Sequence, residues 1–269
     1  MSTQRLIGML IFPRLTQLDM TGPYEVLARL PNTQVHLVAH TLDPVKTDRG
    51  MMIVPTVTYA NCPQLDVLMV PGGPGQQDLM EDSVVLEFLQ RQARGAKYVT
   101  SVCTGSLVLG AAGLLKGKRA TSHWAAIDHL KALGAIPVND RVVIDGNIVT
   151  GAGVASGIDF ALAVAAMLEG EEVAREIQLQ IEYDPAPPFN SGSPKTAALE
   201  LLAALRGEGV SATIREGDES DPLVGVIAVE DTHHNRVDII LGIRGMDPAA
   251  FSRTQPAPLP LPARRDQKR

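Results

Sequence analysis

Cys103 is the candidate nucleophile of this sequence. It follows the apolar run 98–102 and precedes the small residues of 104–106, an order typical of a turn from a buried strand into a helix. Such a turn presents a side chain at the carboxyl edge of the sheet, where α/β proteins bind ligands, and the helix N–H groups are expected to lower the thiol pKa. The arrangement parallels the nucleophile elbow of hydrolases. The alternative is a small buried hydrophobe, a common role of free cysteines.

A second turn that only small residues can form follows the apolar run 67–70. It reads Pro71-Gly72-Gly73-Pro74-Gly75, and the sequence places it at the same sheet edge as Cys103. The backbone N–H groups of Gly73 and its neighbours are expected to form an anion-stabilising pocket, to which proline has no N–H to contribute.

Asp19 follows the end of a third apolar run, 6–12. A carboxylate beside a thiolate is unfavourable unless one of the two groups is protonated. A pair of this kind therefore suggests proton exchange during turnover. The alternative is that Asp19 caps the amino end of a helix predicted over 21–30.

A parallel sheet would bring Cys103, Gly72 and Asp19 together at one edge. The sequence is consistent with such a sheet, because segments typical of strands alternate with segments typical of helices. Asp145-Gly146-Asn147 marks a hairpin within 142–150. The fold class is therefore α/β, with a mostly parallel sheet flanked by helices on both faces. The predicted strands are 6–12, 35–38, 67–70 and 98–102, and the predicted helices are 24–30, 84–93, 105–115, 155–168 and 171–182.

The amino-acid composition limits the kinds of partner that we expect for this protein. The 269 residues are 45% hydrophobic and 20% charged, with a net charge of -6, which is ordinary for a globular protein and disfavours nucleic acid as a partner. No leader resembles a signal peptide, and no apolar run reaches the roughly 20 residues of a spanning helix. We therefore expect no membrane partner and a cytoplasmic location, with Cys62 and Cys103 as free thiols.

The chain changes character near residue 196. A catalytic domain is predicted over 1–195, an extension of unknown role over 196–254, and a disordered tail over the proline-rich 255–269. Within the extension we predict a helix over 197–205, a strand over 210–215 and a hairpin of 224–229 with 237–243. The pair His233-His234 lies on the turn of that hairpin and lacks further ligands at metal-binding spacing, so no metal site is predicted.

Several segments together resemble a known family. The chain is similar to the ThiJ/PfpI group of the class I glutamine amidotransferase-like superfamily, and most closely to its isocyanide hydratase members. The resemblance covers about residues 4–195 and implies a flavodoxin-like sandwich. The segments that carry it are 17–23 (QLDMTGP), 70–73 (VPGG), 100–106 (TSVCTGS), 120–124 (ATSHW), 145–147 (DGN), 178–183 (QLQIEY) and 187–190 (PPFN).

The resemblance implies a reaction in which an isocyanide takes up water to give an N-substituted formamide. It implies Cys103 as nucleophile, Asp19 as general acid/base and Thr104 as part of the local hydrogen bonding. No metal or organic cofactor is implied, and the family suggests a homodimer acting on a small molecule. The residues expected around the substrate or oxyanion are Gly72, Gly73, His123 and Trp124.

This chain differs from related groups at particular positions, and these differences help to choose among the alternative functions. Protease-like members carry His directly after the cysteine, where this chain has Thr104, and glyoxalase-like members place Glu near the position of Asp19. Bacterial transcription regulators share a stretch similar to 121–124, which leaves a ligand-sensing module as a rival. The segment after Pro194 is too short for their usual pair of helix-turn-helix motifs. For His123, a packed or capping role stays open.

Overall fold

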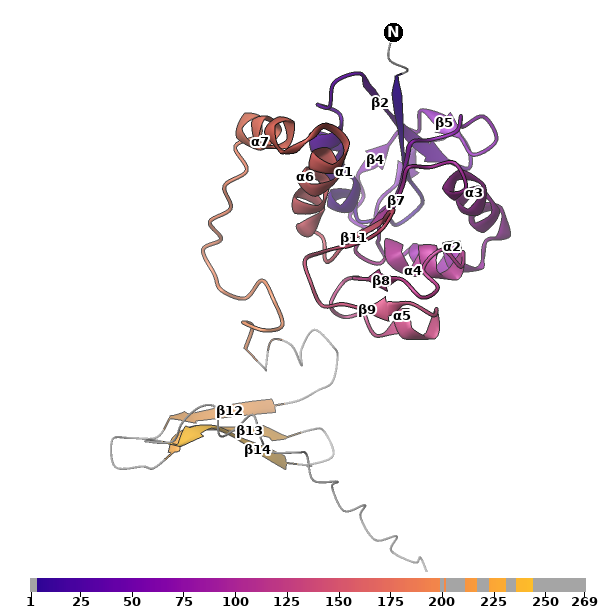
Figure 1. Cartoon of the computed structure of the whole chain (residues 1–269). Coiled ribbons are helices and arrows are strands. Elements are labelled where there is room, and N and C mark those ends of the chain that lie inside the picture. The colour runs from indigo at the N-terminus through magenta and orange to yellow at the C-terminus, as the bar shows by residue number, and fades with distance from the viewer. Residues whose placement is uncertain (1–3, 199–200, 202–210, 217–222, 231–235, 244–269) are drawn as a thin grey trace, which may run out of the picture. The chain divides into compact units, whose positions relative to one another are not determined.

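The computed structural model describes residues 4–198, 201, 211–216, 223–230 and 236–243. These residues form two compact units, divided between Ala186 and Pro187 (Figure 1). The boundary at residue 195 between the catalytic domain and the extension of 196–254 stays a prediction.

The first unit is built on a seven-stranded sheet in the order β10-β11-β7-β6-β1-β2-β5. Every neighbouring pair is parallel except the hairpin of β10 with β11. All four residues of β6 are buried, as expected of a parallel strand covered on both faces. The strands are β1 (Arg5–Leu10), β2 (Thr33–Ala39), β5 (Val57–Thr58), β6 (Val67–Val70), β7 (Tyr98–Val102), β10 (Val142–Asp145) and β11 (Ile148–Gly151).

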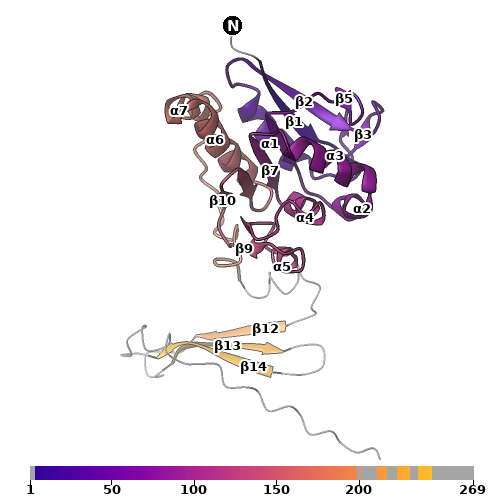
Figure 2. The ribbon, with the colours of Figure 1, turned by 45° about the vertical axis from the view of Figure 1, so that its right-hand side comes forward.

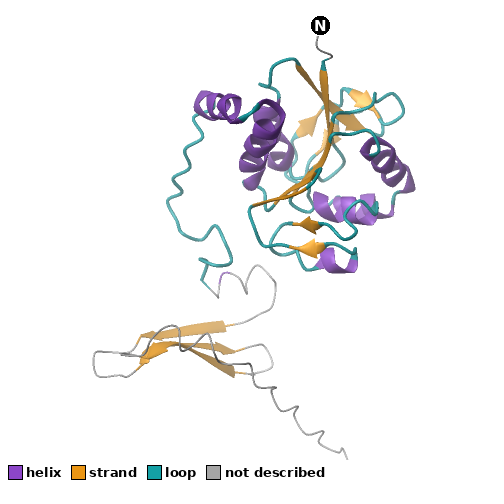
Figure 3. Ribbon diagram, in the orientation of Figure 1, coloured by secondary structure: helices purple, strands orange, loops and turns teal. Residues whose placement is uncertain are grey.

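Helices cover both faces of this sheet, which confirms the predicted α/β sandwich. On one side α1 packs on α6 and α6 on α7; on the other, α2 contacts α3 and α4 (Figures 1 and 2). Figure 3 shows the strands between the two groups of helices. The helices are α1 (Gln17–Leu27), α2 (Gln76–Glu81), α3 (Ser83–Ala93), α4 (Gly105–Ala111), α5 (His129–Ala132), α6 (Ser156–Glu169) and α7 (Glu171–Gln180).

Two minor sheets and two short helices, α2 and α5, were not predicted. The strands β3 (Val45–Lys46) and β4 (Met52–Ile53) form an antiparallel hairpin, and β8 (Arg119–Ala120) pairs in parallel with β9 (Ile136–Pro137). Strands of two residues are too short to leave a periodic pattern in the sequence.

The start of α1 differs from the prediction. The sequence Thr21-Gly22-Pro23 suggested a helix beginning near residue 21, but α1 begins at Gln17 and contains Pro23. Packing against α6 accounts for this. A Cβ on Gly22 would lie 3.3 Å from Ile158, and a Cβ on Gly157 would lie 3.1 Å from Pro23. The small residues match the two helices to each other, so tertiary contact overrides the local signal.

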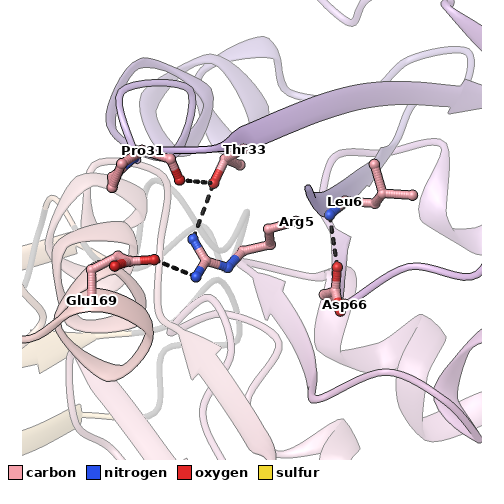
Figure 4. A network of polar contacts seen from close by, with 6 residues as sticks. All are labelled: Arg5, Leu6, Pro31, Thr33, Asp66 and Glu169. Carbon is pink, nitrogen blue, oxygen red and sulfur yellow. Dashed lines mark hydrogen bonds and ion pairs between the residues drawn. The ribbon is translucent and has the colours of Figure 1, made fainter. Parts of the chain in front are cut away.

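Charged side chains tie the amino end of β1 to its surroundings (Figure 4). Arg5 donates to the hydroxyl of Thr33 at 3.1 Å and pairs with Glu169 at the end of α6. The neighbouring Leu6 N–H donates to Asp66 at 2.7 Å. These contacts fix β1 at the end opposite to the one that carries Asp19.

The second unit contains an antiparallel three-stranded sheet, which confirms the predicted strand and hairpin. Its strands are β12 (Ser211–Glu216), β13 (Leu223–Glu230) and β14 (Arg236–Ile243). The helix predicted over 197–205 falls largely outside the described residues, and so do His233, His234 and the tail of 255–269. Among the residues that the structure describes, no helix is long and apolar enough to cross a membrane.

Replacing Gly105 tests the packing that positions Cys103. A Cβ on this residue would lie 2.1 Å from the carbonyl oxygen of Val70 in β6, so Gly105→Ala must displace α4 from the sheet. We expect a loss of about 1–3 kcal/mol in the free energy of unfolding, measured by urea denaturation. Gly192→Ala is the control, because nothing lies within 4 Å of a Cβ there. A wild-type urea midpoint for Gly105→Ala would contradict the close approach.

Candidate active site

The candidate site lies at the carboxyl edge of the sheet, where the strand order reverses. From β1 the chain continues outward to β2, and β6 then pairs with the opposite side of β1. Open α/β sheets bind ligands at such switch points. The segments after β1, β6 and β7 carry Asp19, Gly72 and Cys103, so the structure brings together the three segments that the sequence singled out.

Cys103 occupies a left-handed backbone conformation with φ 57°, which costs free energy for a residue with a side chain. Four hydrogen bonds hold it there. Its N–H donates to the carbonyls of Gly151 at 3.0 Å and Ala152 at 2.8 Å. Its carbonyl accepts from the hydroxyls of Ser106 and Ser122, both at 3.1 Å. This is the predicted elbow, and it leaves the residue 5% exposed.

These four supporting groups were not predicted as site residues. Ser122 belongs to a segment quoted only for its resemblance, and Ser106 to the small residues after Cys103. Gly151 and Ala152 reach the site because β11 pairs with β7. The pattern of a hairpin followed by a helix was visible in the sequence, but the pairing partner of β11 was not.

Asp19 is completely buried in the first turn of α1. Its Oδ2 accepts a hydrogen bond from the Gly72 N–H at 2.9 Å, its Oδ1 has no hydrogen-bond partner among the described residues, and the Cys103 thiol lies close enough for each group to shift the pKa of the other. No side chain caps α1, whose N-cap residue is Thr16. The carboxyl group therefore faces the thiol across the sheet edge, and the capping alternative for Asp19 is wrong.

Burial dominates the acidity of this pair. It raises the pKa of Asp19 to about 7, although the Cys103 thiol and the Gly72 N–H act in the opposite direction. The pKa of the Cys103 thiol is also raised, first by burial and then by the neighbouring Asp19 charge. The expected net lowering of that thiol pKa is therefore wrong. Above about pH 7 the two groups share one proton and one negative charge.

Thr104 is placed to assist the sulfur. Its N–H and hydroxyl lie close enough to the Cys103 sulfur to lower the thiol pKa, by less than burial raises it. The Thr104 Oγ1 accepts from the Gly73 N–H at 3.0 Å, which leaves the hydroxyl hydrogen available to the sulfur. The predicted part of Thr104 in the local hydrogen bonding is thus present.

Glycine at position 72 is a steric requirement of the site. A Cβ there would lie 2.5 Å from the Thr104 nitrogen and 2.9 Å from the Asp19 Oδ2. The N–H groups of Gly72 and Gly73 are both engaged by Asp19 and Thr104. Their observed role is to position the acid and the hydroxyl, and their part in an anion pocket stays a prediction.

His123 and Trp124 lie beside the backbone support of Cys103. Both are partly buried, with ring centroids 5.5 Å apart, and His123 packs closely on Gly153. Its Nδ1 accepts from the Ala125 N–H at 3.3 Å, and burial lowers its pKa. The capping alternative is thus observed, and a role in the substrate pocket stays a prediction. The described residues contain no cluster of three or more His, Cys, Asp or Glu that would hold a metal.

Burial of the Asp19 carboxyl group predicts how the free energy of unfolding depends on pH. Folding raises the pKa of Asp19 from 3.8 to about 7, so unfolding releases a proton within this window and stability falls as pH rises through it. The shift corresponds to a loss of about 4 kcal/mol. Asp19→Asn retains an acceptor for Gly72 but does not ionise. The difference in unfolding free energy between wild type and Asp19→Asn should therefore change from pH 4 to pH 7; a constant difference would contradict the raised pKa.

Known proteins are similar to this chain in sequence and in structure. The chain is 62% identical to the isonitrile hydratase of Pseudomonas putida over 200 residues, which cover 74% of this chain and 88% of that protein. It is 33% identical to a glutathione-independent glyoxalase of Caenorhabditis elegans, over 52% of this chain and 75% of the relative. A solved ThiJ/PfpI family protein from Pseudomonas syringae is 47% identical, with a TM-score of 0.74 over 76% of this chain and 85% of that one.

Residues 5–167 match the DJ-1/PfpI family model. This range contains β1, β6, β7 and β11, whose carboxyl ends or hydrogen bonds form the site, together with Asp19, Gly72, Cys103 and Thr104. The chain belongs to the DJ-1/PfpI family.

Proposed function

We propose that this chain is an isocyanide hydratase, which adds water to an isocyanide to give an N-substituted formamide. The observation that carries the proposal is the buried Cys103–Asp19 pair, in which a nucleophile and an acid share a proton at an elbow. The similarity to the Pseudomonas putida isonitrile hydratase supports the choice of substrate.

The first step joins the sulfur to the terminal carbon of the isocyanide. Asp19 takes the thiol proton while the sulfur attacks, and the same proton is then delivered to the carbon, which becomes a C–H group. The S–H bond is broken, and S–C and C–H bonds are formed, so the intermediate is a thioimidate with no net charge. The N–H and hydroxyl of Thr104 stabilise the sulfur as its proton leaves.

The second step uses water. The Asp19 carboxylate accepts one proton from a water molecule as the water oxygen adds to the thioimidate carbon, and it passes that proton to the substrate nitrogen. The C–S bond then breaks as the added hydroxyl becomes the formamide carbonyl, and Asp19 carries the hydroxyl proton to the leaving sulfur, which restores the thiol and the carboxylate. The buried position of Asp19 suits this cycle, because a pKa of about 7 lets the group give and accept a proton near neutral pH.

Activity measurements on two variants test the proposal. We expect Cys103→Ala and Asp19→Asn to reduce formamide production from a simple alkyl isocyanide by at least a thousandfold, because each removes half of the proton-sharing pair. In the wild type, kcat/KM should rise with pH through about 7 as the pair ionises. His36→Gln, on β2 and away from the site, is the control.

Wild-type turnover by Cys103→Ala would overturn the nucleophile. Turnover of a 2-oxoaldehyde in place of the isocyanide would instead favour a glyoxalase activity, such as the name of the Caenorhabditis elegans relative describes.

We also propose a homodimer. Large apolar side chains are exposed on α1, where Leu18 and Tyr24 are 36% and 37% exposed, and on the β3–β4 hairpin, where Met51 and Met52 are 49% and 56% exposed. Hydrogen bonds from Asp48 to the carbonyl of Leu15 and from Thr16 to Asp48 join the hairpin to the start of α1. Exposed apolar side chains on adjoining elements are typical of an interface.

Sedimentation velocity tests this proposal. The wild type should sediment as twice the chain mass of 28.7 kDa, and Met52→Glu should shift it toward the monomer, because a charge at an apolar interface is left without a partner. Leu179→Glu on α7, where the side chain is 83% exposed, should stay dimeric. A wild-type monomer would refute the dimer.

A cytoplasmic location completes the proposal. It is supported by the two cysteines, Cys62 and Cys103, which are both unpaired, as expected in a reducing compartment. Activity confined to a membrane or secreted fraction would contradict it. The expected absence of nucleic-acid and membrane partners stays a prediction.

A further inference from the structure

A second cavity, of about 440 Å³, lies at the carboxyl ends of β1, β2 and β5. This volume is in the range of small-molecule sites. None of its lining residues is Cys103, Asp19, Thr104 or Gly72, so it is separate from the site described above. Its apolar lining comes from the sheet and from α2 and α3, and consists of Ile11, Phe12, Ala39, Val45, Leu79 and Val85.

Tyr59 supplies an unused polar group in this cavity. The residue is only 6% exposed, and its ring stacks on Phe88 at 4.8 Å between centroids and meets the edge of His40 at 6.0 Å. Its hydroxyl makes no hydrogen bond with any of the described residues. Buried hydroxyl groups ordinarily have a partner. Burial and the charge of Asp82 raise the pKa of Tyr59, so the hydroxyl stays protonated and is a donor.

Asp82 offers the complementary acceptor. It lines the same cavity, and its Oδ1 accepts from the N–H groups of Val84 and Val85 at the start of α3. Its Oδ2 has no partner within the described part of the chain. The cavity therefore has an apolar wall with one donor and one acceptor. The carboxylates of Asp43 and Asp82 outnumber the ammonium of Lys46 in the lining, which disfavours an anionic ligand.

We propose that this cavity binds a secondary amide with an apolar substituent, because the amide group supplies both the acceptor for Tyr59 and the N–H donor for Asp82. The amide carbonyl accepts from the Tyr59 hydroxyl, the amide N–H donates to the Asp82 Oδ2, and the substituent contacts the apolar wall. N-substituted formamides share this head group, so the site would also bind the product of the proposed reaction. That last link rests on the proposed function, whereas amide binding does not.

Calorimetric titration of the full chain with N-hexylacetamide tests the inference. We expect binding to the wild type, at least tenfold weaker binding to Tyr59→Phe, which removes only the hydroxyl, and similar weakening in Asp82→Asn, which retains the Oδ1 cap but loses the acceptor. Thr41→Trp, in the exposed loop at the mouth, should block binding. Tyr98→Phe, a tyrosine on β7 outside the cavity, is the matched control and should bind as the wild type does.

Cys103→Ala separates this cavity from the candidate active site. Unchanged amide binding by this variant supports a second site, and loss of binding would overturn it. Undetectable binding to the wild type, or equal binding to the wild type and Tyr59→Phe, would also overturn the inference. Each of these results is independent of whether the chain hydrates isocyanides.

Discussion

A carboxyl group buried away from bulk solvent determines how the residues around it must be arranged. Asp19 is completely buried, and burying a carboxylate is so costly that the group keeps its proton to a higher pH. The Gly72 N–H and the Cys103 thiol compensate part of that cost. The Gly72 N–H comes within 2.9 Å of the carboxyl group, which is why the turn after β6 has no side chain at position 72.

The sheet supplies the rigidity that this arrangement needs. β1, β6 and β7 are adjacent and parallel, so the three segments that leave their carboxyl ends meet without long loops. The support extends one strand further, because the carbonyls that hold the Cys103 N–H come from the end of β11 and the residue after it. Two serines hold the carbonyl of the same residue, in the next peptide unit. A strained residue persists only when its surroundings determine it in this way.

The parts that were predictable from the sequence are those that depend on local pattern. β6 and β7 were predicted with their observed bounds: β6 is a continuous apolar run, as expected of a strand buried on both faces, and β7 is a short run of strand-forming residues that ends at the turn of Cys103. The start of α1 was not, because Thr21-Gly22-Pro23 resembles a helix start and the packing of Gly22 on α6 leaves no local signal. Gly151 and Ala152 likewise reach Cys103 only because β11 pairs with β7.

The pKa of the Cys103 thiol was likewise not predictable from local sequence pattern. A cysteine before a helix predicts a lowered thiol pKa, but the sequence carries no measure of how deeply the pair is buried, and burial decides the sign. The candidate residues Cys103, Asp19 and Thr104 were therefore predictable, while their protonation was not.

Deep burial of the sulfur also bears on chemical selectivity. Peroxides and other soft electrophiles in solution react with exposed thiolates, and much less with protonated thiols. Cys103 is 5% exposed and the pKa of its thiol is raised, so little thiolate is available to such reagents near neutral pH. We therefore expect the buried thiol to oxidise slowly in solution and to react with molecules that fit beside Asp19.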